Sequence, residues 1–197
     1  GQWTFDADNR LKYPKNDMPP VVTAAKEDSY LQEAKAYAAK HFHDNYASVE
    51  NFIYPTDHVG ASLWLDEFLE TRFEKFGSYE DAMVANEHYL HHSVLTPMLN
   101  IGLLSPQQII DKALQVTDNK NIPLNSLEGF IRQIIGWREF IRMVYVSKGS
   151  TERTRNYWGF TRKIPPQFWD GTTGILPVDQ TIKKVLKTGY CHHIERL

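Results

Sequence analysis

The stretch that decides the fold of this chain is residues 124–142, LNSLEGFIRQIIGWREFIR. Asn125 and Ser126 can cap its start, and its apolar side chains then recur with a period of about 3.6 residues over a wide arc. Such coverage is typical of a helix buried on most of its faces in the centre of a domain. We therefore expect this helix, the longest in the chain, to organise the core.

Further helices are expected on both sides of this stretch. Caps, apolar periodicity and chain breakers place them at residues 28–42, 61–77, 79–103 with an interruption at Pro97, 105–114 and 179–189, with one or two further turns from Tyr190. Residues 43–59 and 148–177 are expected to be irregular because they carry prolines and glycines. Strand-like alternation is scarce, so the sequence predicts an all-α fold.

The composition narrows the class of protein. Hydrophobic residues make up 42% and charged residues 23% of the 197, which is a globular rather than a disordered composition. The single cysteine, Cys191, excludes a disulfide framework within the chain. No apolar run approaches the roughly 20 residues that span a bilayer, and no signal-peptide region is recognised, so we expect a cytoplasmic protein without a membrane partner. The net charge of −2 does not by itself indicate nucleic-acid binding.

Residues 91–104, HHSVLTPMLNIGLL, form the first candidate site. The hydroxyls of Ser93 and Thr96 precede a helix start near Pro97. Hydroxyls and backbone N–H groups at a helix N-terminus are good partners for a phosphate group. The alternative is that both hydroxyls only cap that helix.

The second candidate lies within the central helix. Arg138 sits on a mostly apolar helix, where a guanidinium needs a carboxylate or a phosphate as its partner. Trp137 beside it could serve as a stacking surface. The alternative is a structural ion pair, with Glu139 close by in sequence, and a tryptophan in the core.

The third candidate is residues 189–197, GYCHHIERL. On a helix, His192 and His193 would point about 100° apart, so one could contact a ligand while the other packs. They could not easily share a metal ion. His88 and His92 have the spacing of a chelating pair, but the Glu that follows the first histidine in zinc-protease helices is lacking, so no metal site is predicted. The alternative is a buried, hydrogen-bonded histidine.

The fourth candidate is a segment in which cations alternate with aromatic rings. Its members are Lys148, Arg153, Arg155, Tyr157, Trp158, Arg162 and Lys163. Cations suit phosphate contacts and flat rings suit base stacking. The alternative is a solvated loop whose aromatic side chains are tucked inward.

Taken together, these segments resemble the photolyase and cryptochrome family, and more closely its prokaryotic (6-4) photolyase branch, the deoxyribodipyrimidine photolyase-related proteins. The likeness covers essentially the whole chain and is strongest in residues 92–105, 124–142, 168–174 and 189–197. It implies a helical FAD-binding domain that is incomplete at its C-terminus. Residues 1–60 would be the inter-domain connector with the first helix, and residues 61–197 the N-terminal part of the FAD-binding domain.

The resemblance also implies roles for individual residues. The FAD-binding positions would be Tyr79, Ser93, Leu95, Thr96, Gln133, Arg138 and Arg196. The positions facing the lesion or the DNA would be Trp137, Arg153, Arg155, Tyr157, Trp158 and Arg162. His193 would donate a proton to the lesion, with His192 beside it. The second histidine of the animal (6-4) enzymes, four residues on, is Leu197 here, as in the prokaryotic branch.

The function implied by the resemblance is light-driven repair of UV pyrimidine dimers in DNA, with (6-4) photoproducts favoured. Reduced FAD would donate an electron to a dimer flipped out of the duplex. Two alternatives remain open at this point. One is a cryptochrome-like blue-light receptor without repair activity, and the other is a helical interaction module without a cofactor.

The expected partners are FAD, damaged DNA and an antenna chromophore on an N-terminal domain outside this sequence. An iron–sulfur cluster is doubtful because Pro177 stands near the position of the family's first cluster cysteine and no cluster ligand is recognisable. We expect the chain alone to bind FAD weakly or not at all and not to repair DNA. We also expect exposed apolar surface to favour self-association.

Overall fold

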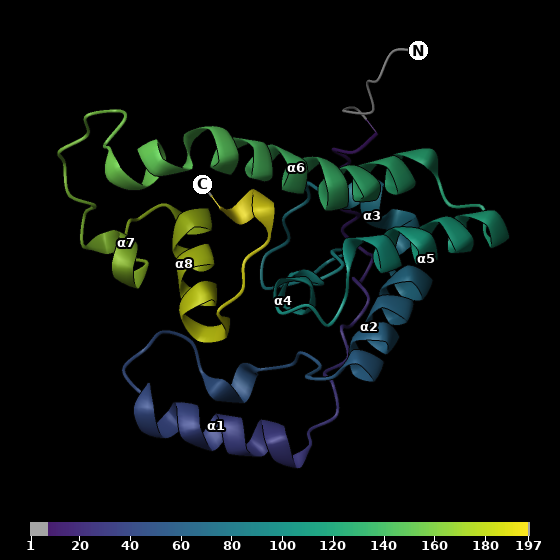
Figure 1. Cartoon of the computed structure of the whole chain (residues 1–197), viewed down its shortest axis with the longest axis horizontal. Helices are drawn as coiled ribbons and strands as arrows, with labels where there is room; N and C mark the ends of the chain where they lie inside the picture. Colours follow the sequence, from purple (N-terminus) through teal and green to yellow (C-terminus); the bar gives the residue numbers. More distant parts are fainter. Residues whose placement is uncertain (1–7, 197) are drawn as a thin grey trace.

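The computed structural model describes residues 8–196, and within this range the chain folds into helices and turns without a strand (Figure 1). The predicted all-α fold is confirmed. The elements are α1 (Ser29–His41), the 3₁₀ turn η1 (Val49–Asn51), α2 (His58–Thr71), α3 (Phe73–Tyr79), α4 (Thr96–Asn100), α5 (Pro106–Asn119), α6 (Leu124–Thr154), α7 (Gln167–Asp170), α8 (Leu176–Thr188) and the 3₁₀ turn η2 (His193–Glu195).

A cluster of four phenylalanines forms the centre of the core where α2, α3 and α6 meet. Phe68, Phe73, Phe76 and Phe130 are each at most 4% exposed. The ring of Phe130 lies 5.0–5.5 Å from those of the other three. Aromatic pairs at such distances contribute about 0.5–1.5 kcal/mol beyond the area that they bury. The first part of α6 is therefore anchored by a ring that contacts two other helices.

A glycine allows α3 and α6 to approach each other closely. A Cβ on Gly77 would lie 2.6 Å from the backbone of Asn125 and Ser126. The Ser126 hydroxyl accepts a hydrogen bond from the Gly77 N–H at 2.9 Å and donates one to the Glu74 carbonyl at 2.7 Å. Ser126 was expected to cap the start of the long helix. Its side chain instead joins that helix to α3.

The long helix α6 is buried along only part of its length. Phe130 and Ile134 are 2% and 5% exposed and belong to the core. Most of the apolar residues that follow are 44–74% exposed, namely Ile135, Trp137, Phe140, Ile141, Met143, Tyr145 and Val146, while Val144 is half-buried. The prediction of a helix buried throughout was right for the first part and wrong for the second. Among residues 8–196, neither α6 nor another helix is both long and apolar enough to cross a bilayer.

Two predicted boundaries in the first half of the chain were wrong. The helix expected over residues 61–77 is broken at Arg72, whose guanidinium is fully buried and pairs with Glu67 at 2.8 Å. The helix expected over residues 79–103 exists only as the short α4. Asn86, Leu90 and Val94 have positive φ values of 67°, 46° and 55°, which are incompatible with a right-handed helix.

Boundaries also differ in the second half. The loop expected from residue 148 begins only after Thr154, and the hydroxyls of Ser147 and Thr154 bond to carbonyls of their own helix. Helix α8 begins at Leu176 rather than at Asp179. The Asp179 carboxylate is held by the N–H groups of Thr173 and Gly174 in the loop before the helix.

Two predicted helix starts are confirmed. Asp28 caps α1 by accepting a hydrogen bond from the Leu31 N–H at 2.8 Å. Ser105 and Gln108 form a reciprocal capping box at the start of α5, with Pro106 in the first turn. Both starts depend only on neighbouring residues, which is why the sequence predicts them.

Candidate functional site

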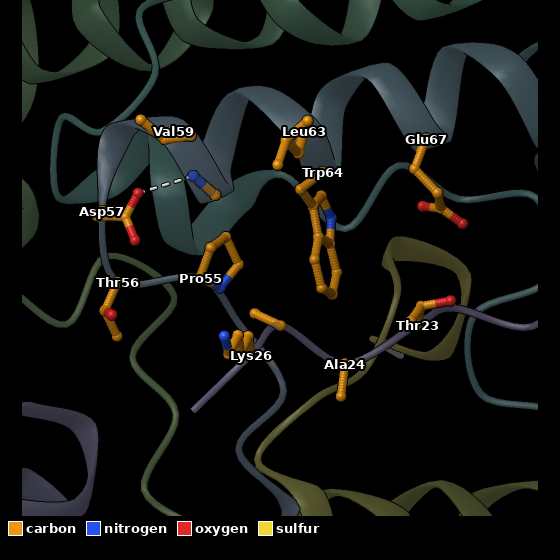
Figure 2. A pocket seen from close by; sticks show the side chains of 12 residues that line it. Thr23, Ala24, Lys26, Pro55, Thr56, Asp57, Val59, Leu63, Trp64 and Glu67 are labelled. Atoms are coloured by element: carbon orange, nitrogen blue, oxygen red, sulfur yellow. Dashed lines mark hydrogen bonds between the residues drawn. The ribbon is translucent and has the colours of Figure 1, made fainter. Parts of the chain in front are cut away.

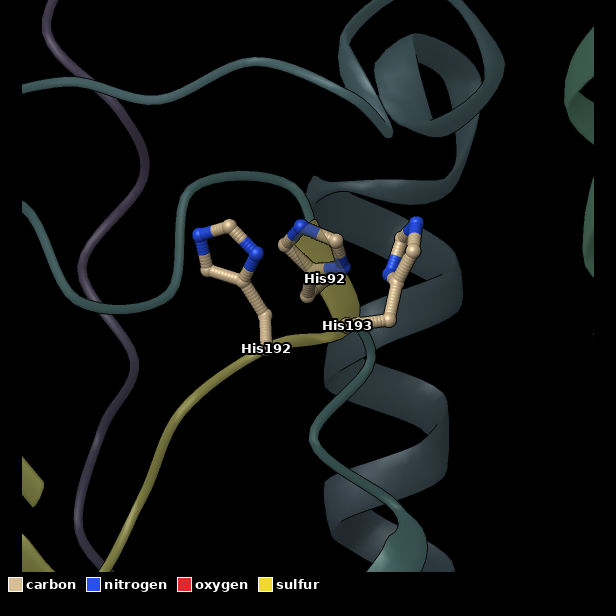
Figure 3. Close-up of side chains that lie close together, drawn as sticks. All are labelled: His92, His192 and His193. Carbon is tan, nitrogen blue, oxygen red and sulfur yellow. The ribbon is translucent and has the colours of Figure 1, made fainter. Parts of the chain in front are cut away.

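Three histidines from two distant parts of the chain lie side by side. Figure 3 shows His92 between His192 and His193. The rings of His92 and His192 are stacked, with centroids 4.6 Å apart and planes 16° apart, and the His92 and His193 centroids are 5.4 Å apart. One ring nitrogen from each histidine lies within 4.8 Å of the others. We call these three residues the histidine cluster.

The backbone near the end of the chain explains how His192 and His193, which are adjacent in sequence, both lie against His92. The turns expected from Tyr190 were expected to be helical, with the two rings about 100° apart. His192 instead has extended backbone (φ −81°, ψ 170°) and only His193–Glu195 form a 3₁₀ turn. The expectation of a helix at this point was therefore wrong, and the rings of His192 and His193 lie on either side of His92.

Burial sets the charge of two members of the cluster. His92 is 7% exposed and His192 is 5% exposed. Burial lowers the pKa of His92 well below its ordinary value, and repulsion from the neighbouring histidines adds to this. Burial also lowers the pKa of His192 to about 4, although Glu195 acts in the opposite direction. Both rings are therefore neutral at pH 7.

Glu195 holds the His192 ring in place. Its Oε2 lies 3.5 Å from the His192 Nε2 and accepts a hydrogen bond from the His192 backbone N–H at 3.2 Å. Both carboxylate oxygens also bond to Lys184 of α8 in a pair whose side chains are 8% and 9% exposed. Removing either partner would leave a buried charge, so this ion pair fixes the histidine turn against α8.

Asp81 holds the third histidine. Its Oδ1 lies 3.4 Å from the Nε2 of His193, and its other oxygen lies 3.3 Å from the Arg10 Nε. The His193 side chain is 42% exposed, so this histidine is the member of the cluster that solvent or a ligand can reach.

The predicted phosphate-binding segment is continuous with the cluster because Ser93 follows His92. The Ser93 carbonyl accepts a hydrogen bond from the Trp64 indole at 3.2 Å, and Thr96 is exposed at the first position of α4. Leu95 is 1% exposed in the core, so only its backbone is placed to meet a ligand. Tyr79 lies near this segment, with its ring 5.6 Å from that of His91.

Trp137 and Arg138 do not match the structural alternative of an ion pair with a core tryptophan. Trp137 is 61% exposed and stacks on Phe140, with centroids 5.6 Å apart and planes 14° apart. Arg138 is half-buried, its Nη1 donates to the Ile134 carbonyl at 3.1 Å, and burial lowers its pKa. Gln133 is exposed on the same helix.

The carboxylate expected to pair with Arg138 bonds elsewhere. Glu139 accepts hydrogen bonds from the Nε and Nη2 of Arg142 at 2.9 and 2.8 Å. Arg138 has no ion pair with a carboxylate among the residues that the structure describes. Its remaining N–H groups are available to a ligand.

The basic and aromatic segment is exposed. Arg153 lies in the last turn of α6, and the others follow it. Tyr157 and Trp158 are 80% and 74% exposed and meet edge to face with centroids 5.0 Å apart. Arg155 and Arg162 are exposed as well. The alternative of aromatic rings tucked inward does not describe this segment.

Arg196, at the other end of the chain, is exposed and donates from its Nη2 to the Cys191 carbonyl at 3.4 Å. The comparison with animal enzymes at Leu197 lies outside the described residues.

A surface cavity of about 420 Å³ lies between the N-terminal arm and α2. Figure 2 shows Trp64 and Glu67 of α2 facing Thr23 and Ala24 of the arm. The same indole bonds to the Ser93 carbonyl, so Trp64 separates this cavity from the phosphate-binding segment. No predicted site residue lines the cavity.

Comparison with known proteins gives three matches. A family model described as deoxyribodipyrimidine photo-lyase-related protein matches residues 1–54. The whole chain is 32% identical to a (6-4) photolyase of Agrobacterium fabrum (strain C58 / ATCC 33970) and covers 39% of that protein. A 114-residue part is 39% identical to the uncharacterized protein R853 of Acanthamoeba polyphaga mimivirus and covers 85% of it.

The family model and the identity over the whole chain support the photolyase-related family. The chain spans 39% of the length of the Agrobacterium (6-4) photolyase. The aligned region extends over all 197 residues.

The structure adds residues to the candidate site that the sequence did not place there. Asp81, Glu195 and Lys184 orient the histidines, and His92 supplies the third ring. Only His92 gave a signal, through its place in residues 91–104. The other three are common surface residue types, and their role depends on contacts between segments far apart in sequence.

Glu80 is a further residue that the sequence did not indicate. It is 6% exposed, accepts a hydrogen bond from Asn9 at 2.8 Å, and faces Gly129 of α6, where a Cβ would lie 3.4 Å from its Oε2. Burial raises its pKa, and the charges of Arg132 and His193 act in the opposite direction. Glu80 thus links the first part of α6 to the neighbourhood of the histidine cluster.

Proposed function

We propose that this chain is part of a light-driven, FAD-dependent DNA photolyase that repairs UV pyrimidine dimers, with (6-4) photoproducts as the favoured lesion. The observation that carries the proposal is the histidine cluster, in which a solvent-accessible His193 is held by Asp81 beside two buried neutral imidazoles. The identity to a (6-4) photolyase supports the choice of lesion.

We further propose the domain division expected from the sequence. Residues 61–197 would be the N-terminal part of a helical FAD-binding domain, and residues 1–60 a connector with the first helix. In support, the buried residues of the main core cluster all lie between Ala61 and Ile134.

The side chains near the site have the chemistry that FAD requires. The hydroxyls of Ser93 and Thr96 suit the diphosphate, and the exposed indole of Trp137 offers a flat apolar face. Arg138 carries unpaired donors for an anionic group. When bound and reduced, FAD would supply the light-driven electron, and the protein would supply position, electrostatics and a proton.

His193 would be the proton donor. It is the accessible member of the cluster, and the Asp81 carboxylate beside its Nε2 would fix the orientation of the ring. His92 and His192, which are buried and neutral, would form the wall against which His193 is positioned. The roles of the adjacent histidines would thus differ because their burial differs.

The segment from Arg153 to Arg162 would contact DNA. Its guanidinium groups are exposed and can neutralise phosphates, while Tyr157 and Trp158 present open ring faces or edges to an unstacked base. Binding through these cations would weaken as the salt concentration rises.

A chimera would test the proposal. In it, this chain replaces the segment of the Agrobacterium (6-4) photolyase with which it aligns. We expect a yellow protein with flavin absorbance that removes (6-4) photoproducts from irradiated DNA in light and not in darkness. The unaltered Agrobacterium protein is the control, and a two-state urea unfolding transition checks that the chimera folds.

Each other outcome has a defined meaning. A folded chimera that binds flavin without repair would favour the blue-light receptor, and a folded chimera without flavin would favour the interaction module. Either result contradicts the proposed repair function. For the chain alone, isothermal titration should show FAD binding weaker than micromolar.

A further inference from the structure

The ring nitrogens of the histidine cluster are incompletely used by the protein. The buried Nε2 of His92 and Nδ1 of His192 have no hydrogen-bond partner among residues 8–196. Each unpaired buried polar atom costs about 1–3 kcal/mol. A neutral imidazole nitrogen without a proton has a lone pair, which a metal ion accepts as well as a hydrogen-bond donor does.

Carboxylates determine which nitrogens are free. Glu195 lies 3.5 Å from the Nε2 of His192, and Asp81 lies 3.4 Å from the Nε2 of His193. If the Nε2 of each ring carries its proton beside the carboxylate, the Nδ1 of each ring keeps an unprotonated lone pair. Histidines that bind metals almost always donate their second N–H to a carboxylate, a carbonyl or water in this way.

From this arrangement we propose that His92, His192 and His193 bind a divalent transition-metal ion of the Zn²⁺ class. One ring nitrogen of each residue already lies within 4.8 Å of the others. Three imidazoles with a fourth position left to water form a ligand set that Zn²⁺ adopts in proteins. Figure 3 shows the His92 ring between those of His192 and His193, so the ion would bind beside His92.

The histidine rings must move to bind an ion, and His193 has the most exposed side chain of the three. Zn–N bonds of about 2.0–2.1 Å place nitrogens of a tetrahedral site about 3.3 Å apart, so the rings must close by at most about 1.5 Å. His193 can move because its side chain is 42% exposed. The stacked rings of His92 and His192 must also turn, because a nitrogen lone pair lies in the plane of its ring.

The charges around the cluster are balanced. Lys184 is a buried cation beside Glu195, and its charge is compensated by both oxygens of that carboxylate. Arg10 is paired with Asp81 at 3.3 Å and is largely exposed. A divalent ion bound to the histidines would therefore have two carboxylates behind its ligands, those of Glu195 and Asp81. Each carboxylate is already paired with one cation.

This inference does not depend on the proposed repair function, because the cluster is formed within the described chain. The two activities would compete. A metal ion bound to His193 would occupy the nitrogen lone pair and restrain the ring that is proposed to donate a proton. Metal binding by this chain would thus give an inhibited state of the repair enzyme.

Cobalt(II) and zinc(II) titrations of the 197-residue chain test the proposal. We expect one equivalent of Co²⁺ to produce the intense visible bands of a tetrahedral site, and one equivalent of Zn²⁺ to abolish them. A competition titration with a chromophoric chelator then gives the Zn²⁺ affinity, which we expect to be micromolar or tighter.

Single substitutions show which histidines bind the ion. They are chosen so that a loss of affinity can be distinguished from a loss of folding. His193→Asn changes an exposed side chain and should lower the Zn²⁺ affinity by at least about 100-fold, while Asp81→Asn should lower it by about 10–100-fold. His88→Asn, at a half-buried histidine outside the cluster, is the matched control and should leave the affinity unchanged. Circular dichroism confirms that each variant is folded.

The proposal would be overturned by any of three results. One is the absence of tetrahedral Co²⁺ bands in the unaltered chain. Another is a His193→Asn variant that keeps the full affinity. The last is a His88→Asn variant that loses as much affinity as His193→Asn, which would place the ion on another pair of histidines.

Discussion

The two ends of α6 have the same apolar pattern and opposite surroundings. In the first part, Phe130 is 2% exposed and contacts three other phenylalanines. In the second, Phe140 is 50% exposed and Trp137 lies on it with 61% of its own surface open. Apolar periodicity thus specifies a helix, but it does not say what covers the helix. The first part belongs to the core, and the second carries the proposed FAD and DNA contacts.

The largest expected effect is a difference between two phenylalanines ten residues apart on one helix. Phe130→Ala should destabilise the chain by about 3–5 kcal/mol because it leaves a cavity among packed rings. Phe140→Ala should change stability by less than about 1 kcal/mol. Urea unfolding followed by circular dichroism measures both. Equal losses of stability would show that the two parts of α6 are equally packed, which would contradict the difference in burial described above.

The next largest effect concerns the close approach that anchors the first part. Gly77→Ala should cost about 2–3 kcal/mol, because the new methyl group meets the backbone of Asn125 and Ser126 at 2.6 Å and cannot be relieved by rotating a side chain. The midpoint of urea unfolding is again the readout. A variant as stable as the unaltered chain would mean that α3 and α6 are farther apart than described.

The third prediction concerns Glu80, a buried carboxylate that faces the first part of α6. Burial raises the pKa of Glu80, so the folded chain binds its proton more tightly than the unfolded chain does. That contribution to stability is complete below the ordinary carboxyl pKa and is lost as the pH rises through the raised pKa.

Glu80→Gln removes this loss and keeps an oxygen for the hydrogen bond from Asn9. The variant should therefore gain stability relative to the unaltered chain as the pH rises from 4 to 7. Unfolding curves at several pH values give the difference. A difference that is independent of pH would show that Glu80 titrates normally.

The smallest effect belongs to the exposed part of α6. Gly136→Ala adds a methyl group whose nearest neighbour is the flexible Arg132 side chain at 3.6 Å. It should stabilise the chain by about 0.5–1 kcal/mol, because alanine favours a helix interior over glycine. The thermal midpoint should rise accordingly. A fall would indicate that another element covers this face.

The sequence predicted those features of the fold that are determined locally. The caps at Asp28 and Ser105 and the period of α6 depend on neighbouring residues, and all three are confirmed. The break at Arg72 and the turns through Leu90 and Val94 depend on tertiary contacts. A fully buried arginine or a positive φ at a branched residue has no local signal, so these features could not be predicted.

The same division applies to the candidate site. The sequence identified residues 91–104, Trp137 and Arg138, and the adjacent histidines as unusual. It did not place His92 against His192, because that contact joins segments 100 residues apart and depends on extended backbone at His192. Nor did it identify Asp81, whose ordinary surroundings in the sequence conceal its contact with His193.

The central claim is that His193 is a proton donor rather than a packing residue. The most direct measurement is the yield of (6-4) photoproduct repair per absorbed photon in the chimera described above, with His193→Asn beside the control His88→Asn. We predict that His193→Asn lowers the yield by at least about 100-fold while flavin absorbance is retained, and that His88→Asn has no effect. Full repair by a folded, flavin-loaded His193→Asn protein would contradict the claim.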